Sequence, residues 1–317
     1  MRDDETPVRV GLVGAGQWAA QMHAPLHAAP GPTQLVGIWA RDADRAAALA
    51  TRHRVRAFAR YADLLAEVEA VDFAVPPAVQ ARLGREAAYA GKALMLEKPL
   101  AADLSGAEEL VAAIEARGVP TLVAMTRRYD ATTREFLRLA GDARGGGLVA
   151  ACGAFAHGGL LPGGFVGQKE RSGWRSDLGV LFDLGPHLID VVDAAAGTIT
   201  AVRAEELPGE VVCVQTTHEG GALGQLLLSG RVRVETSIFS VDLLGHDGRH
   251  QLDAGAVDVP ALRATMRREF ADAVRRGAPP TVDARRALHV ERVLTACVHS
   301  LARGGAPELI NPSQSGD

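Results

Sequence analysis

The first 125 residues alternate apolar, strand-like runs with helix-like stretches, and this alternation constrains the fold more than any other feature. Val8–Val13 and Ala93–Leu96 are continuous apolar runs, and Leu104–Arg117 is typical of a helix that joins two such strands. Strands joined by helices at this spacing form βαβ units, in which the strands lie parallel. The sequence therefore predicts a doubly wound parallel sheet over residues 1–126.

A second domain is predicted over residues 127–317, because the pattern changes at this point. A helix at Ala131–Ala140 is followed by strand-like runs with short glycine turns, and a helix at Pro186–Ala196 interrupts them. The runs are Leu148–His157, Val202–Leu207, Val211–Thr217, Ala222–Leu228, Val232–Ile238 and Val241–Leu244, and the closing helices are Ala261–Arg276 and Ala284–Ala302. This order predicts an α+β domain whose sheet is an antiparallel meander. The polar tail from Gly304 is expected to fray.

The composition of the 317-residue chain excludes several classes of protein. A formal net charge of −4 gives no general attraction to nucleic acid or to an anionic membrane. Apolar runs such as Gly221–Ser229 are far shorter than the roughly 20 residues that span a bilayer. Cys152, Cys213 and Cys297 form no CxxC or Cys/His cluster, so no metal site is predicted. Because the acidic, polar start is no secretory signal, a cytoplasmic protein is expected that binds neither nucleic acid nor membrane.

A glycine loop follows the first strand directly. Residues 14–19 (GAGQWA) fit the G-x-G-x-x-G/A pattern of dinucleotide sites, between a strand and a helix. Gly14 permits a tight turn, Gly16 lets backbone N–H groups approach a pyrophosphate, and Ala19 lets the helix pack closely on the strand. The loop predicts a dinucleotide site, with a glycine turn that binds no nucleotide as the alternative. The candidate cofactor-binding residues here are Gly14, Gly16, Gln17, Trp18 and Ala19.

The end of the second predicted strand bears on the choice between NAD and NADP. An NAD site usually places Asp or Glu there, but this chain has Ala40 followed by Arg41. An arginine at this place suits a ribose 2′-phosphate and can stack on the adenine, so NADP is favoured. Two alternatives stay open: Arg41 is a solvated loop residue, or Asp42 reaches the ribose of NAD.

A lysine stands at the carboxyl end of the strand Ala93–Leu96, within Glu97-Lys98-Pro99. Doubly wound folds bind their ligands at this edge of the sheet. Lys98 is also one of only three lysines among 34 basic residues, and lysine releases its proton more readily than arginine when it is desolvated. Lys98 is therefore a candidate catalytic residue, although a lysine at a strand end is often simply solvated.

The sequence Asp183-Leu184-Gly185-Pro186-His187 suggests a carboxylate and an imidazole at the start of a helix. Pro186 suits the first helical turn, which places Asp183 just before the helix and His187 within it. His187 and Asp190 then share one helix face. This arrangement suits proton transfer, and a capping aspartate with a packed histidine is the alternative.

Taken in order, these motifs resemble the glucose–fructose oxidoreductase / inositol dehydrogenase family, Gfo/Idh/MocA, nearly from end to end. The motifs that carry the resemblance are the glycine loop with His23 after it, Gly91-Lys92, Glu97-Lys98-Pro99, Arg127-Arg128-Tyr129-Asp130, Trp174-Arg175, the D-x-G-x-H of Asp183 to His187, and Glu269-Phe270 with Pro279-Pro280. The resemblance implies a Rossmann domain followed by an α+β domain with a large, open-faced, mainly antiparallel sheet. In relatives this sheet commonly forms the subunit interface, which implies a homodimer or homotetramer.

The resemblance also implies an activity and roles for individual residues. Family members usually oxidise a secondary alcohol, or reduce a ketone, of a sugar, cyclitol or related polyol with a nicotinamide cofactor. Carried over, Lys98 would hold the reacting oxygen, His187 would act as acid/base, and Asp183 would bind or orient. The further expected contacts are Pro76, Glu97 and Lys98 for the cofactor and Arg128, Trp174 and Arg175 for the substrate.

Two stretches depart from the family pattern. Relatives often carry Asn and His after the proline that follows the fourth strand, where this chain has Pro77-Ala78-Val79-Gln80. A glycine triplet often precedes D-x-G-x-H, where this chain has Leu178-Gly179-Val180. The substrate is therefore not transferable from relatives. An NAD-dependent glycoside hydrolase and a non-catalytic dinucleotide-sensing regulator are the alternative functions, and Gly158–Arg175 is either a mobile substrate loop or a long connection.

Overall fold

The computed structural model describes residues 6–145, 147–162 and 174–310. The chain folds as two compact units: residues 1–125 with 259–288, and residues 126–258 with 289–317. The first boundary lies where the sequence pattern changes. The second arises because a later helix, α9 (Val259–Arg276), packs with the N-terminal unit.

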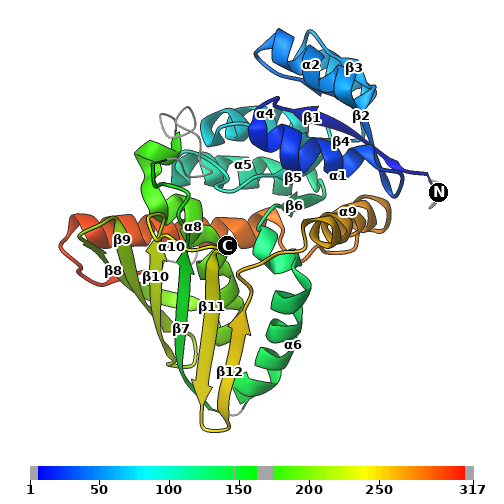
Figure 1. The fold of residues 1–317 in the computed structure, drawn as a ribbon. Helices are drawn as coiled ribbons and strands as arrows, with labels where there is room; N and C mark the ends of the chain where they lie inside the picture. The colour runs from blue at the N-terminus through cyan, green and yellow to red at the C-terminus, as the bar shows by residue number, and fades with distance from the viewer. Residues whose placement is uncertain (1–5, 146, 163–173, 311–317) are drawn as a thin grey trace. The chain divides into compact units, whose positions relative to one another are not determined.

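The first unit contains a six-stranded sheet in the order β3-β2-β1-β4-β5-β6, with every pairing parallel. Its strands are β1 Val8–Val13, β2 Thr33–Trp39, β3 Arg56–Ala57, β4 Ala70–Phe73, β5 Ala93–Leu96 and β6 Thr121–Val123. Its helices are the π-helical η1 Ala19–His23, α1 Ala24–Ala28, α2 Ala43–His53, α3 Tyr61–Glu67, α4 Pro77–Tyr89, α5 Leu104–Arg117 and α9 (Figure 1). The predicted doubly wound sheet is confirmed, and its strand order reverses between β1 and β4.

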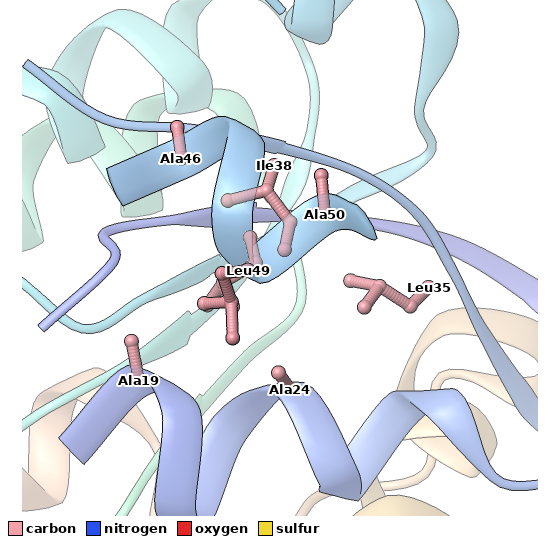
Figure 2. Packing of buried hydrophobic residues seen from close by; sticks show 8 residues of the cluster. Ala19, Ala24, Leu35, Ile38, Ala46, Leu49 and Ala50 are labelled. Atoms are coloured by element: carbon pink, nitrogen blue, oxygen red, sulfur yellow. The ribbon is translucent and has the colours of Figure 1, made fainter. Parts of the chain in front are cut away.

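Local sequence explains where these helices begin and how they pack. Asp42 and Asp103 cap α2 and α5, since their carboxylates accept hydrogen bonds from the backbone N–H of Arg45 and Gly106 at 3.0 and 2.8 Å. Figure 2 shows the packing between α2 and the helices that follow β1, where alanines on both sides meet Leu35, Ile38 and Leu49. The buried cluster is Leu12, Ala19, Ala24, Leu35, Ile38, Ala46, Leu49 and Ala50. The small alanine side chains let both helices approach the sheet closely.

Two arginines of α9 tie that helix to the N-terminal unit. Arg275 forms a bidentate ion pair with Glu69, with distances of 2.9 and 3.0 Å between guanidinium nitrogens and carboxylate oxygens. Arg267 donates to the carbonyl oxygen of Ala29 at 2.6 Å and to the hydroxyl of Thr33 at 3.1 Å. Arg267 is 8% exposed, so these bonds satisfy a charge that is largely removed from water.

The second unit contains a seven-stranded sheet in the order β12-β11-β7-β10-β9-β8-β13 (Figure 1). Its strands are β7 Leu148–Ala156, β8 Ile199–Leu207, β9 Val211–His218, β10 Leu223–Ser229, β11 Ile238–Gly245, β12 Gly248–Asp253 and β13 Glu308–Leu309. Its helices are the 3-10 helix η2 Thr126–Tyr129, α6 Ala131–Gly145, α8 Trp174–Ala196 and α10 Ala284–Ala302, of which the residues up to Leu288 group with the first unit. The predicted α+β class with a mainly antiparallel sheet is confirmed, except that β7 and β10 pair in parallel.

The two faces of this sheet differ in burial. Alternate residues of β9, β10 and β11 are buried, and α8 packs on these strands and on β7. The opposite face leaves Leu223 60% exposed, and Leu227 and Ile238 each 39% exposed. The sheet is therefore covered on one face and open on the other.

Two sequence expectations about strands and the tail of this unit are wrong, and one strand was not expected. Val232–Ile238 is not a strand: the N–H of Val232 bonds to the carbonyl oxygen of His157, and β11 begins only at Ile238. Val232 and Val234 alternate with Arg233 and Glu235 as residues of a strand do, so the sequence pattern gives no sign of this difference. β12 was not expected because its sequence, GRHQLD, is polar. The tail is not frayed at Glu308–Leu309, which pair with β8.

Candidate active site

The glycine loop lies where the strand order of the first sheet reverses. Gly14 has φ of +125°, and a Cβ there would collide with the carbonyl oxygen of Ala74, directly after β4. Its N–H bonds to the carbonyl oxygen of Trp39 at the end of β2, at 2.9 Å. A Cβ at Gly16 would meet nothing within 4 Å, so the loop backbone is open to a ligand on that side. Glycine is therefore required at position 14 for the turn, and position 16 leaves the space that a pyrophosphate needs.

The loop leads into the π-helical turn η1 and then into α1, where Pro25 stands in the first turn. Ala19 is fully buried in the cluster of Figure 2, while Gln17 and Trp18 are exposed. This arrangement gives Ala19 the packing role expected of the last position in the pattern. It leaves Gln17 and Trp18 on the outside of the loop.

The residues after β2 divide between the surface and a helix cap. Ala40 is half-buried and Arg41 is exposed. The carboxylate of Asp42 accepts the N–H of Arg45 at the start of α2. Asp42 thus has a structural role, and Arg41 is the charged group that this segment presents to solvent.

The Glu97 carboxylate connects the glycine-loop side of the unit with the backbone of Lys98. Oε1 accepts from the indole Nε1 of Trp18 at 2.7 Å and lies 3.0 Å from Nε2 of His23. Oε2 accepts the N–H of Lys98 at 3.1 Å. The Glu97 side chain is only 13% exposed, and Lys98 is 8% exposed. Both carboxylate oxygens of Glu97 thus have hydrogen-bond partners within the protein.

Gln80, which the sequence placed only within a departure from the family pattern, holds the same segment from α4. Its side chain is fully buried. Nε2 lies within hydrogen-bond distance of the carbonyl oxygens of Glu97, Pro99 and Leu100, at 2.7, 3.2 and 3.1 Å. Oε1 accepts the N–H of Glu97 at 2.8 Å. Pro76, expected on the cofactor side, is exposed just before this helix. The only sequence signal was the departure from the family pattern at Pro77-Ala78-Val79-Gln80.

His23 and Asp72 form a fully buried pair beneath the glycine loop. Nδ1 of His23 lies 2.9 and 3.0 Å from the two oxygens of Asp72. Burial by itself would lower the pKa of His23, but the charge of Asp72 and hydrogen bonds to Asp72 and Glu97 raise it to about 10. Burial would raise the pKa of Asp72, but the charge and hydrogen bond of His23 outweigh it, and that pKa is lowered. The pair is therefore ionised at neutral pH.

In the second unit, α8 carries the predicted proton-transfer residues. The helix is broken at Gly179, with φ 67° and ψ −170°, and Pro186 lies inside the stretch that follows. The expected helix start at Pro186 is therefore wrong, because the glycine breaks the helix two turns earlier. Asp183 lies within the helix, so Asp183, His187 and Asp190 are spaced i, i+4 and i+7 along one face.

The surroundings of this helix face are aromatic on one side and charged on the other. The His187 side chain is 9% exposed, and its ring lies 6.0 Å from that of Phe155 with an interplanar angle of 65°. Nη1 of Arg128 pairs with Oδ1 of the fully buried Asp190 at 3.1 Å. Arg128, expected to bind substrate, thus has a partner within its own unit.

Some predicted residues lie at or beyond the edge of the described structure. Trp174 and Arg175 begin α8, but their side chains fall outside the described residues, as does most of Gly158–Arg175. The structure brings the glycine loop, Glu97 and Lys98 together in one unit, and Asp183, His187 and Arg128 in the other. The candidate residues therefore fall into two groups, each within its own unit.

Residues 8–125 match the Gfo/Idh/MocA family model, which describes an oxidoreductase family with an NAD-binding Rossmann fold. This part of the chain is similar to that oxidoreductase family. The match covers the glycine loop, Gln80 and the Glu97-Lys98 segment, which are the parts of the first group described above.

The proteins that this chain is similar to include named sugar and polyol dehydrogenases. It is 29% identical to the UDP-N-acetylglucosamine 3-dehydrogenase of Acidithiobacillus ferrooxidans over 86% of this chain and 85% of that protein. It is 36% identical to inositol 2-dehydrogenase 3 of Saccharopolyspora erythraea over 46% of this chain and 44% of that protein. The chain thus spans less than half of the latter, and 58% of an uncharacterized oxidoreductase from Rhizobium meliloti.

The same fold occurs in a crystal structure of GenD2, from gentamicin A biosynthesis, in complex with NAD. The TM-score is 0.83 at 23% identity, over 98% of each chain.

Within residues 6–145, 147–162 and 174–310, no three or more His, Cys, Asp or Glu side chains gather as a metal site. None of the helices in these ranges is both long enough and apolar enough to cross a bilayer.

Proposed function

We propose that this protein is an NAD(P)-dependent oxidoreductase that transfers hydride between the nicotinamide and a secondary alcohol or ketone of a sugar, cyclitol or similar polyol. The observation that carries the proposal is the link from the glycine loop through Glu97 to Lys98 in one unit. A dinucleotide loop and a desolvated lysine joined in this way suit a reaction at the carboxyl edge of a parallel sheet. The names of the two dehydrogenase relatives support the substrate class.

Residues 14–19 would hold the pyrophosphate, and we propose that NADP is the preferred cofactor. Gly14 makes the required turn, and Gly16 leaves open space beside the loop. Arg41 is exposed directly after β2, where it suits a 2′-phosphate, whereas Asp42 is used as a helix cap. A bound nicotinamide would accept or donate the hydride.

The remaining chemistry belongs to residues of this chain. Oxidation of a secondary alcohol removes a proton from oxygen as hydride leaves carbon, so a cation is needed beside the developing alkoxide. Lys98 supplies that cation, and His187 takes the proton in oxidation and returns it in reduction. Asp183, one helical turn from His187, orients the imidazole or the substrate. These roles require Lys98 and His187 to face the same substrate.

The test measures turnover of a panel of sugars, cyclitols and their ketones. The reaction is monitored by the absorbance of the nicotinamide, with NADP and with NAD. We expect at least one polyol to reduce the added dinucleotide, and the Lys98→Met variant to lose this activity while it still binds dinucleotide. A wild-type protein that binds dinucleotide tightly but turns over none of the panel would contradict the proposal.

The open face of the second sheet supports a proposed homodimer or homotetramer. Leu223 and Leu227 of β10 and Ile238 of β11 are exposed apolar side chains on this face, and β7 lies between the two strands. Exposed apolar groups on a sheet face are typical of subunit interfaces. Light scattering of the purified protein should give a mass of two or four chains, and a monomer at all concentrations would refute this assembly.

A further inference from the structure

A chain of buried polar groups runs from α9 to Lys98 within the first unit. Arg267 Nε donates to Thr33 Oγ1 at 3.1 Å, and Thr33 Oγ1 lies 2.8 Å from Nδ1 of His27. His27 Nε2 lies 3.1 Å from Asp72, which also pairs with His23. His23 then reaches Glu97, whose carboxylate accepts the N–H of Lys98. Hydrogen bonds thus link six residues one after another, from Arg267 to Glu97.

A guanidinium can only donate, so the Thr33 hydroxyl accepts from Arg267. The hydroxyl keeps one proton that it can give to Nδ1 of His27, and a neutral His27 ring then donates from Nε2 to Asp72. The pKa of His27 is accordingly lowered, mainly by burial.

His23 is placed differently, because both of its ring nitrogens face carboxylates. Ionised carboxylates only accept, so Nδ1 must donate to Asp72 and Nε2 must donate to Glu97. Two N–H groups make the ring an imidazolium. The titratable and charged groups around it are Asp72 from β4 and Glu97 after β5, with the neutral His27 of α1 and the charged Arg267 of α9 beyond Asp72.

We infer that His23, charged at neutral pH, is a positioning residue which together with Trp18 and Gln80 fixes Glu97 and so holds Lys98 in place for the reaction proposed above. The inference rests on the proposed function for the role of Lys98. The charge of His23 follows from its place between the carboxylates of Asp72 and Glu97 and does not depend on that function. Glu97 in this arrangement is a fixed acceptor, with one oxygen toward the glycine loop and the other toward the backbone of Lys98, and it is not a general base.

The first measurement concerns the charge of His23 and does not depend on turnover. Nitrogen NMR of the histidine rings at pH 8 should show one doubly protonated imidazole, which disappears in the His23→Gln variant. His218 is a matched control, since it is also buried, with Nε2 at 2.8 Å from Thr216 and Nδ1 at 2.7 Å from a backbone oxygen. His218→Gln should leave the doubly protonated signal unchanged. A singly protonated His23 at pH 8 would overturn the inference.

The second measurement separates positioning from general stability. His23→Gln should lower kcat by about 10- to 100-fold, with a much smaller change in KM, because the loss lies in the alignment of Lys98. His218→Gln should lower thermal stability without lowering kcat. A folded His23→Gln variant with kcat within twofold of the wild type would refute the positioning role. If the wild type itself turns over no polyol, the proposed function fails while the NMR result still decides the charge of His23.

A milder variant serves if His23→Gln does not fold. Trp18 is 41% exposed, so Trp18→Phe removes the indole N–H from Glu97 with little loss of buried packing. We expect kcat to fall by about 3- to 10-fold in this variant, since one of three hydrogen bonds to the Glu97 carboxylate is lost. An unchanged kcat in folded Trp18→Phe would count against the proposal that Trp18 helps to position Glu97 and Lys98.

Discussion

The two groups of candidate residues are held in place by different means. Lys98 follows a strand, and its segment is held by the side chain of Gln80, which lies 17 residues before Glu97, and by the carboxylate of the neighbouring Glu97. Asp183 and His187 are fixed by their spacing on one helix, which packs on the sheet of its own unit. The first arrangement depends on buried hydrogen bonds with defined donors and acceptors. The second depends on helix geometry and on packing against groups such as Phe155.

The largest expected effect comes from replacing the central residue of either group. Lys98→Met and His187→Ala should each lower kcat by about 10²- to 10⁴-fold, because one removes the cation at the reacting oxygen and the other the proton carrier. Steady-state kinetics with the best polyol of the panel measures the loss, and circular dichroism checks that both variants fold. Near-normal activity in either folded variant would show that its group does not serve the reaction.

A smaller effect is expected from Gln80, which supports only the first group. Gln80→Ala leaves the N–H of Glu97 and three backbone oxygens without their side-chain partner, and should destabilise the protein by about 2–4 kcal/mol. It should also lower kcat by about tenfold through the displaced Lys98. Chemical denaturation and kinetics measure the two losses. Gln80→His, which keeps a ring N–H donor at this position, should recover part of both; no recovery would indicate that the contacts require the amide geometry of glutamine.

The sequence predicted the first group better than the second for a physical reason. The position of Lys98 follows from a strand of four apolar residues, and the parallel sheet then fixes which edge it occupies. In α8 the helical stretch that carries Asp183 and His187 begins after the break at Gly179. The sequence instead predicted a helix start at Pro186, because proline is typical of a first helical turn. Gln80 and the bond from His23 to Asp72 join residues 17 to 49 positions apart, and no local pattern reports such contacts.

The pH dependence of stability should distinguish the two units. The raised pKa of His23, about 10, means that its pairing stabilises the fold fully below about pH 6.5 and is lost as the pH rises toward 10. The free energy of unfolding should therefore fall with pH across this window, by up to about 1.4 kcal/mol per pH unit. Urea denaturation at several pH values measures the slope. His23→Gln should flatten it and His218→Gln should not; equal slopes in all three proteins would contradict a charged His23.

The smallest expected effect concerns Arg41, an exposed residue that neither group requires for its geometry. We expect the wild type to bind NADPH more tightly than NADH, because the guanidinium can pair with the 2′-phosphate. Arg41→Ala should weaken NADPH binding by about 3- to 10-fold and leave NADH binding unchanged, since an exposed pair is screened by solvent. Fluorescence titration with both dinucleotides measures the difference, and added salt should reduce it. Equal affinities of the wild type for the two would remove NADP preference from the proposal. They would also show that Arg41, at the edge of β2, plays no part in the choice of cofactor.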